Sequence, residues 1–167
     1  VYSNPIYAAR TTAAETDWQD EIYQNGPMQN YDLSLSGGND NSTFRLSAGY
    51  LNQQGIVIKT GLERYNFRVN SDFKKGRLKI GENLGLTYGV QDPLSDEGGR
   101  SLLEHEIKMA PYLPVYNKDN LGGYQGPTSA VDGQDAENPV RIMELNSRKL
   151  NALTILGNLY GELELMK

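Results

Sequence analysis

Residues Met28 to Gly55 read MQNYDLSLSGGNDNSTFRLSAGYLNQQG and contain the clearest structural pattern in the chain. Apolar and polar residues alternate on both sides of a Gly-rich centre, and this period of two residues is typical of β-strands. The segment Ser36–Ser42 between the two halves is rich in Gly and Asn, which favour tight turns. We therefore predict a β-hairpin whose apolar face carries Tyr31, Leu33, Leu35, Phe44, Leu46, Ala48 and Tyr50.

Three later stretches show the same alternation and predict three more strands. The apolar face of the first carries Tyr65, Phe67, Val69 and Phe73, and that of the second carries Leu78, Ile80, Leu84, Leu86, Tyr88 and Val90. The apolar face of the last carries Leu153, Ile155, Leu159, Leu163 and Leu165. Glu82 is the one polar exception in the second pattern. The predicted fold class is all-β, an antiparallel meander.

The connections between the predicted strands alternate in length. Ser36–Ser42 and Lys74–Gly76 are tight, whereas Asn52–Gly61 is longer and Gln91–Leu150 is very long. Successive hairpin links lie at opposite ends of the strands, so the tight links share one end and the long ones the other. We expect the longest link to hold a short helix across Ser101 to Met109. The expected organisation is a preceding segment 1–27, four strands in 28–90, a long loop 91–149 and a further strand in 150–167.

Composition excludes several classes of protein. No apolar run approaches the ~18 residues of a membrane helix. The formal net charge of -5 and the lack of a Lys/Arg cluster argue against a nucleic-acid partner. The chain has no Cys, which removes disulfides and thiolate metal sites. Because the chain opens on Val1 and ends at Lys167 inside a predicted strand, we expect it to be a fragment of a larger protein.

The apolar faces could pack in a protein core or face lipid, because a soluble β-sandwich shows the same alternation as a membrane barrel. Three features favour the barrel. Tyrosines gather at the long-loop end of the apolar face and phenylalanines near its tight turns, as in aromatic girdles. The strand Leu78–Val90 is about 40 Å long at ~3.3 Å per residue, enough to cross a bilayer at a tilt. The opposite face carries too many charges for a dry interior: Arg45, Arg64, Arg68, Lys79, Glu162 and Glu164.

Several segments, in family order, closely resemble SusC/RagA-type TonB-dependent outer-membrane transporters. They are TDWQDEI (16–22), PMQNY (27–31), LSLSGG (33–38), GYLNQQGI (49–56), ERYNFR (63–68), GENL (81–84), APYLPVY (110–116), NP (138–139) and GNLY (157–160). The resemblance covers most of the chain and places it among the early barrel strands that follow the plug of such a transporter.

The resemblance implies a 22-stranded β-barrel in the outer membrane of a Gram-negative bacterium, closed by an N-terminal plug. It also implies a SusD-like surface lipoprotein as partner, energy delivered by the TonB complex through the plug, and import of glycans or peptides. The plug and the remaining strands are then expected outside this chain, and the loop 91–149 is expected to be extracellular. The alternative hypothesis is a soluble extracellular β-sandwich that binds carbohydrate.

No enzymatic activity, cofactor or metal site is expected. No Ser/His/Asp set with recognisable spacing exists, and the single histidine, His105, lacks a second His or Cys beside it. We expect a structural role for His105 at the surface or facing the lumen, and Trp18 is expected to anchor the segment before the first strand. Tyr112, Tyr116 and Tyr124 of the long loop are candidate contacts for a sugar or for the lipoprotein, with self-packing of the loop as the alternative.

Overall fold

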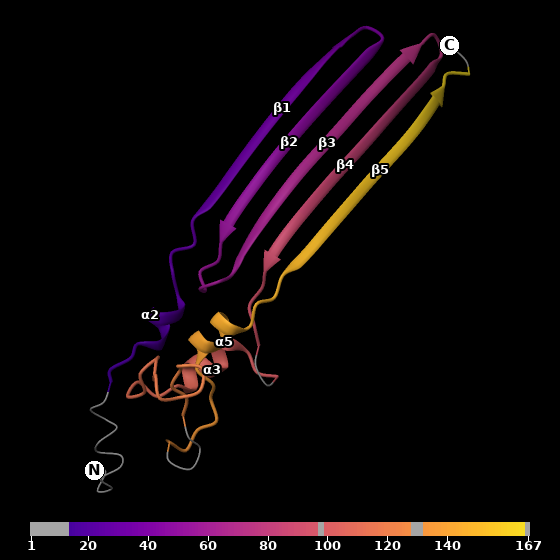
Figure 1. Ribbon diagram of the computed structural model, residues 1–167. Helices are drawn as coiled ribbons and strands as arrows, with labels where there is room; N and C mark the ends of the chain where they lie inside the picture. Colours follow the sequence, from indigo (N-terminus) through magenta and orange to yellow (C-terminus); the bar gives the residue numbers. More distant parts are fainter. Residues whose placement is uncertain (1–13, 97–98, 128–131, 166–167) are drawn as a thin grey trace, which may run out of the picture. The chain divides into compact units, whose positions relative to one another are not determined.

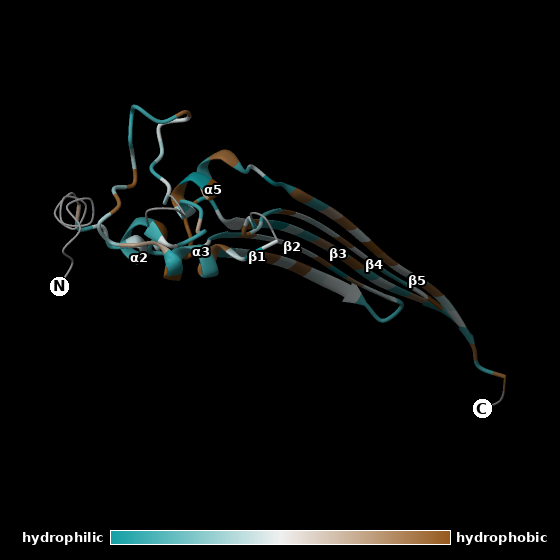
Figure 2. Ribbon diagram, turned by 90° about the horizontal axis from the view of Figure 1, so that it is seen from below, coloured by the Kyte–Doolittle hydropathy of each residue, from teal (hydrophilic) through white to brown (hydrophobic). Residues whose placement is uncertain are grey.

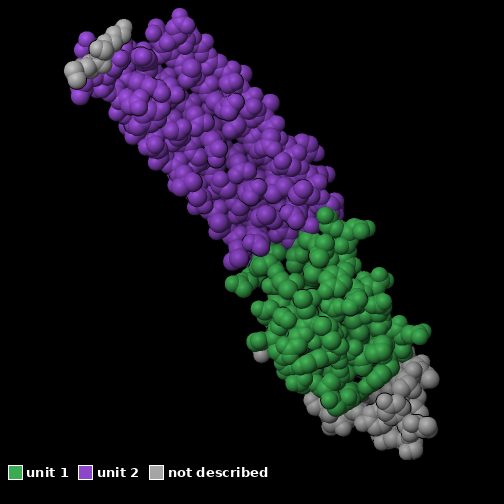
Figure 3. Space-filling view, turned by 180° about the vertical axis from the view of Figure 1, so that it is seen from behind, with its two compact units in different colours: residues 1–26, 55–60, 92–148 green, residues 27–54, 61–91, 149–167 purple. Residues whose placement is uncertain are grey.

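The chain folds into two compact units in a computed structural model that describes residues 14–96, 99–127 and 132–165 (Figures 1 and 3). The sheet unit comprises the described parts of residues 27–54, 61–91 and 149–167. The loop unit comprises the described parts of residues 1–26, 55–60 and 92–148. Each unit is therefore built from segments that are distant in the sequence.

The sheet unit is a five-stranded meander in which each strand lies beside its neighbour in the sequence, in the order β1-β2-β3-β4-β5 (Figure 1). Its strands are β1 Met28–Asn39, β2 Ser42–Gln54, β3 Gly61–Lys75, β4 Leu78–Asp92 and β5 Leu150–Leu163. The pairs β1–β2, β2–β3 and β4–β5 are antiparallel. The predicted all-β fold class and antiparallel meander are confirmed.

The register keeps apolar residues on one face of the sheet. Tyr31 lies opposite Tyr50, which lies opposite Tyr65 on the next strand. One rung further, Leu33, Ala48 and Phe67 are aligned in the same way. Hydrophobic and hydrophilic residues accordingly alternate along the strands in Figure 2. We call the two sides the apolar face, with Leu33, Leu46 and Ile155, and the polar face, with Ser34, Ser47 and Thr154.

The β1–β2 turn is tight because one side chain satisfies its backbone. The Asn39 Oδ1 atom accepts hydrogen bonds from the backbone N–H groups of Asn41 and Ser42, each at 2.9 Å. The N–H of Lys74 donates to the carbonyl of Asn41 at 2.7 Å, which ties this turn to β3. In the second tight turn Gly76 has a φ of 62°, in the left-handed region that Gly adopts without strain. Both predicted tight turns are confirmed.

On the polar face, the ring of Tyr160 packs against Gly81, which lies opposite Tyr160 in the β4–β5 pair. A Cβ atom on Gly81 would collide with this ring and lie 2.5 Å from the Asp72 Oδ1 atom. The Tyr160 hydroxyl donates a hydrogen bond to Asp72, and Lys79 Nζ lies 3.5 Å from the same carboxylate. One cluster thus connects three strands, and it depends on the missing side chain at position 81.

The loop unit has a hydrophobic core of its own, built around α2 Trp18–Ile22, α3 Leu102–Lys108 and α5 Pro139–Leu145. Asp17, Ser101 and Asn138 cap the N-termini of these helices with their side chains. The expected short helix across Ser101 to Met109 is confirmed as α3, whereas α5 was not anticipated. Among the described residues, no helix is both long and apolar enough to span a membrane.

The segment before β1 belongs to this core. Thr16 donates from its N–H to the Pro111 carbonyl and from its hydroxyl to the Leu113 carbonyl, both at 2.8 Å. The Trp18 indole donates to the Ala110 carbonyl at 3.1 Å, and the Trp18 side chain is buried. Trp18 therefore anchors the preceding segment to the long connection between β4 and β5.

Replacing Gly81 by Val tests whether the ring of Tyr160 packs against the backbone of Gly81. The added side chain must displace the ring, so we expect the Gly81→Val substitution to lower the free energy of unfolding by about 1–3 kcal/mol. Gly85→Val is the matched control on the same face of β4, because its Cβ meets only the Leu156 carbonyl oxygen, at 3.9 Å. Thermal unfolding followed by circular dichroism measures both. Equal midpoint temperatures of unfolding for the two variants would contradict the packing of the Tyr160 ring against Gly81.

Candidate functional site

The apolar face carries a row of four tyrosines across four strands. The ring centroids of Tyr31 and Tyr50 lie 6.5 Å apart, those of Tyr50 and Tyr65 5.0 Å, and those of Tyr65 and Tyr88 6.4 Å. Nearer the tight turns the same face presents Phe44 and Phe73. The predicted placement of tyrosines at one level and phenylalanines at another is therefore present in the structure.

Between these two levels the apolar face is mainly aliphatic, with Phe67 among its members, and open. Its exposed members include Leu33, at 76% of full exposure, and Ile155, at 61%. All five strands belong to one sheet, and the described residues provide no second sheet to cover this face. A surface of this kind is suited to an apolar environment, because exposing so many large apolar side chains to water is unfavourable.

One polar pair interrupts the apolar face. The Ser71 hydroxyl donates to the Glu82 Oε1 atom at 3.2 Å, which connects β3 to β4. Glu82 is the exception that the sequence pattern identified. Its carboxylate thus has a hydrogen-bond donor from the neighbouring strand.

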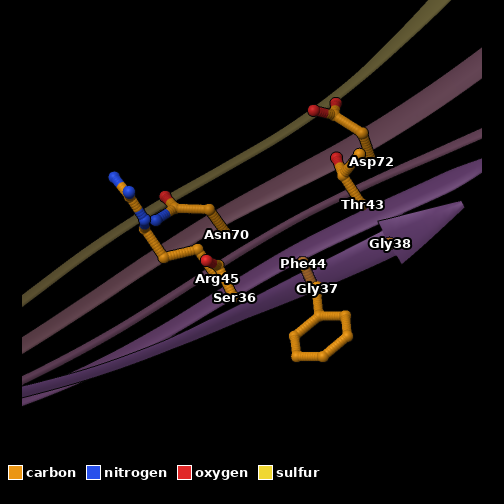
Figure 4. Close-up of a pocket in the computed structure, with 8 residues that line it drawn as sticks. All are labelled: Ser36, Gly37, Gly38, Thr43, Phe44, Arg45, Asn70 and Asp72. Atoms are coloured by element: carbon orange, nitrogen blue, oxygen red, sulfur yellow. The ribbon is translucent and has the colours of Figure 1, made fainter.

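The polar face is lined by hydroxyl, amide and charged side chains. Ser36, Arg45 and Asn70 occupy one rung across β1, β2 and β3. Figure 4 shows these three side chains on the same side of the sheet, with Phe44 on the opposite side. The three side chains border a hollow of about 530 Å³ that also reaches Thr43 and Asp72.

The polar face carries charges of both signs, among them Asp32 on β1 and Glu162 opposite Lys79. Asp72 and Lys79 form an ion pair beside Tyr160, whose ring centroid lies 5.6 Å from Lys79 Nζ. By contrast, Arg45, Arg64 and Arg68 form no ion pair with any residue that the structure describes. These three arginines of β2 and β3 are therefore not held in ion pairs within the described residues.

The structure brings together two of the three tyrosines that sequence analysis selected. Tyr116 and Tyr124 pair across an isolated β-bridge, with ring centroids 5.5 Å apart. Tyr116 is 62% exposed, whereas Tyr124 packs partly against the core of the loop unit. Tyr112 has a different partner, because its hydroxyl donates to Asp132 Oδ1 at 3.1 Å. A role of these three residues in ligand or partner contacts stays a prediction.

His105 is buried in the core of the loop unit, at 1% exposure. Its Nδ1 atom accepts a hydrogen bond from the backbone N–H of Glu137 at 2.9 Å. The expectation of a surface or lumen-facing position for this residue is wrong, because the inner side of α3 packs into the core. The described residues contain no group of three His, Cys, Asp or Glu side chains arranged to hold a metal ion.

Charged groups stabilise the periphery of the loop unit. Hydrogen bonding to Lys108 Nζ at 2.6 Å lowers the pKa of the Glu104 carboxyl, and hydrogen bonding to Arg100 at 3.0 Å lowers that of Asp135. Burial, followed by the hydrogen bond to Glu106, raises the pKa of the Tyr23 hydroxyl. All three shifts favour the protonation states that these groups have at neutral pH.

The known proteins to which this chain is similar are all TonB-dependent receptors. TonB-dependent receptor P3 of Formosa agariphila is 35% identical over 158 residues, which cover 90% of this chain and 15% of the relative. TonB-dependent receptor P26 of the same organism is 32% identical over 151 residues, 90% of this chain and 14% of the relative. TonB-dependent receptor SusC of Bacteroides thetaiotaomicron is 26% identical over 179 residues, 94% of this chain and 18% of the relative. The chain belongs to the SusC-type TonB-dependent receptors.

This chain spans only about 14 to 18% of the length of these receptors. No family model matches it. The relatives are named as receptors, and none of these names denotes an enzyme. The family resemblance drawn from the quoted segments is therefore confirmed, and the sheet unit is an antiparallel portion of a SusC-type receptor.

Two clusters that stabilise this receptor segment were not predicted from its sequence. Asn138 is buried, and its Nδ2 atom donates to the carbonyls of Val115 and Gln125, each at 2.8 Å. An Asn followed by Pro139 is a typical helix start, so this signal was available. The cluster of Asp72, Lys79 and Tyr160 was not foreseeable in this way, because it depends on the register of three strands.

Replacing Asn138 by Asp tests its role in the loop unit of the receptor. The substitution places a carboxylate oxygen 2.8 Å from two carbonyl oxygens, so we expect α5 to lose about 2–3 kcal/mol of stability. Asn120→Asp is the matched control, because the Asn120 amide also donates to a carbonyl, that of Tyr124 at 3.0 Å, but is exposed to water. Hydrogen exchange of the α5 amides at neutral pH measures the change. Equal protection in both variants would count against a structural role of Asn138.

Proposed function

We propose that this chain forms part of the wall of a transport barrel in the outer membrane of a Gram-negative bacterium. The observation that carries the proposal is the separation of the two faces of the sheet, with an exposed aliphatic band between tyrosine and phenylalanine levels. In this arrangement the apolar face contacts lipid and the polar face lines the lumen. The tyrosines suit the outer interface, where the ring lies in the apolar zone and the hydroxyl contacts water.

The proposed organisation follows the sequence analysis. Residues 28–90 supply four barrel strands, residues 150–167 supply a further strand, and residues 91–149 form an extracellular loop after the fourth strand. The segment 1–27 precedes these strands, and its Trp18 and Ile22 side chains are buried in the loop unit. The plug and the other strands of a 22-stranded barrel come from parts of the receptor outside this chain.

The proposed receptor imports glycans or peptides together with a SusD-like surface lipoprotein, using energy that the TonB complex delivers through the plug. The family membership supports these partners. In the loop, Tyr116 and Tyr124 form an aromatic pair whose exposed ring suits stacking on a sugar or contact with the lipoprotein. Tyr112 supports the loop through its hydrogen bond to Asp132. The chain itself performs no chemical step in this proposal.

The alternative hypothesis of a soluble carbohydrate-binding sandwich lacks support from the fold. A sandwich needs two sheets whose apolar faces pack together. In the part of the chain that the structure describes, all five strands form one sheet. We therefore retain the membrane barrel as the proposed function.

A pair of arginine substitutions in the full-length receptor tests which face meets lipid. Leu46 and Ser47 are neighbours in β2 and point to opposite faces. We expect Leu46→Arg to destabilise the inserted barrel by about 2–4 kcal/mol, because it places a charge in the bilayer, and Ser47→Arg to change its stability much less. The denaturant midpoint of the receptor refolded into lipid vesicles, followed by heat-modifiable migration on gels, measures this difference.

Two results would contradict the proposal. One is equal stability of the Leu46→Arg and Ser47→Arg receptors, which would mean that Leu46 does not face lipid. The other is a receptor that fractionates and unfolds as a water-soluble protein without detergent, since the exposed aliphatic band then needs a protein partner instead of a bilayer.

A further inference from the structure

The polar face carries a stripe of arginines across β2 and β3. Arg64, Asn66, Arg68 and Asn70 alternate along β3 on this face, and Arg45 lies opposite Asn70 on β2. Arg64 and Arg68 are about 13 Å apart along the strand at ~3.3 Å per residue. Arg45 and Arg68 are diagonal neighbours, about 7–8 Å apart between Cα atoms. We call Arg45, Arg64 and Arg68 the arginine stripe.

The arginine stripe has no ion-pair partner within the described residues, although Asp32 and Arg68 line the same hollow. All three side chains are exposed, and none forms an ion pair there, whereas the nearby Asp72 and Lys79 are paired with each other. Asp32 also belongs to this face, and its Oδ2 atom accepts a hydrogen bond from the Asn30 side chain at 2.7 Å. The guanidinium groups are thus available to a negatively charged group from outside this chain.

Two hollows adjoin the arginine stripe. The first, with Ser36, Arg45 and Asn70, is shown in Figure 4. The second, of about 280 Å³, lies beside Arg68 and includes Asn66, whose Oδ1 atom accepts from the Thr87 hydroxyl at 3.1 Å. Hydroxyl and amide groups therefore line both hollows, and the second hollow also includes Asp32 and Leu156.

This surface chemistry fits a hydrated chain better than a protein segment. A guanidinium group forms two parallel hydrogen bonds with a carboxylate, and the same fork fits a sulfate group. The surrounding hydroxyls and amides can both donate to and accept from sugar hydroxyls. A docked protein segment needs an apolar centre to bury. On this face the rungs of the arginine stripe carry Leu51 opposite Arg64 and Leu156 at the second hollow, on the separate strands β2 and β5, and these two leucines do not form a continuous apolar centre.

We propose that the arginine stripe is a binding site for the anionic groups of a glycan, its carboxylates or sulfate esters, on the inner wall of the receptor. This inference rests on the proposed function, because it requires the polar face to line the transport lumen. It narrows the substrate from glycans or peptides to anionic glycans. Arg45 and Arg68 hold one anionic group between adjacent strands, and Arg64 is placed to contact a second group further along the chain.

Binding of defined polysaccharides to the full-length receptor in nanodiscs tests the proposal. The probes are dextran sulfate and polygalacturonate, which carry sulfate and carboxylate groups, and neutral dextran. We expect both anionic probes to bind more tightly than dextran, with affinity that falls as salt is added. The double substitution Arg45→Gln with Arg68→Gln is expected to weaken anionic binding on the order of tenfold and to leave dextran binding unchanged.

The matched control removes two positive charges elsewhere. Arg148→Gln with Lys149→Gln changes two exposed residues just before β5, and we expect it to alter anionic binding less than about twofold. The variant Arg45→Lys with Arg68→Lys retains the charge but not the guanidinium fork. It is expected to keep the salt dependence and recover only part of the affinity. If the receptor with Arg45→Gln and Arg68→Gln does not insert into the membrane, the lysine variant still tests the proposal.

Three results would overturn the inference. They are equal affinity of the wild-type receptor for dextran and the anionic probes, equal losses in the stripe and control variants, and a lower unfolding temperature of the stripe variant with unchanged glycan binding. The last result would mean that the arginines pair with a carboxylate of the receptor itself. If the Leu46→Arg and Ser47→Arg receptors are equally stable, the proposed function itself is wrong. If Leu46→Arg is the less stable of the two and any of these three results is found, only the binding role of the arginine stripe is rejected.

Discussion

The antiparallel register of the five strands is the constraint on which the other features of the sheet unit depend. Side chains alternate with a period of two, so a slip of one residue would move every member of a strand to the other face. The rung Tyr31–Tyr50–Tyr65 fixes the register at one level, and the Asn39 turn fixes it near the other end. The separation into an apolar face and a polar face, on which the proposed barrel wall rests, depends on this register.

The polar face contributes its own restraint on register. Tyr160, Asp72 and Lys79 meet across β3, β4 and β5, and the ring of Tyr160 fills the place that a side chain at Gly81 would occupy. The two tight turns restrain the pairs β1–β2 and β3–β4, and this cluster adds a restraint on β3–β4 and extends it to β5. Asp72 and Lys79 of the cluster form an ion pair, whereas the arginines of the stripe form none within the described residues, and this contrast supports a binding role for the stripe.

The loop unit is a small folded body, although it is assembled from three separate connections. Trp18 and Ile22 come from the segment before β1, Val57 from the β2–β3 connection, and Leu102 and Ile142 from the β4–β5 connection. Its backbone is held by side chains such as Thr16 and Asn138 that bond to carbonyls far away in the sequence. A surface loop with such a core can present Tyr116 and Tyr124 in a defined arrangement.

The five strands, their apolar faces, the two tight turns and helix α3 were predictable from local sequence, because each depends on local periodicity, turn residues or capping. It also carried the segments that identify the SusC-type receptors. Tertiary structure alone decided the burial of His105, the pairing of Tyr116 with Tyr124 but not Tyr112, and the cluster around Gly81. These features join residues from separate strands or loops. Their contacts depend on register and packing, which no local pattern encodes.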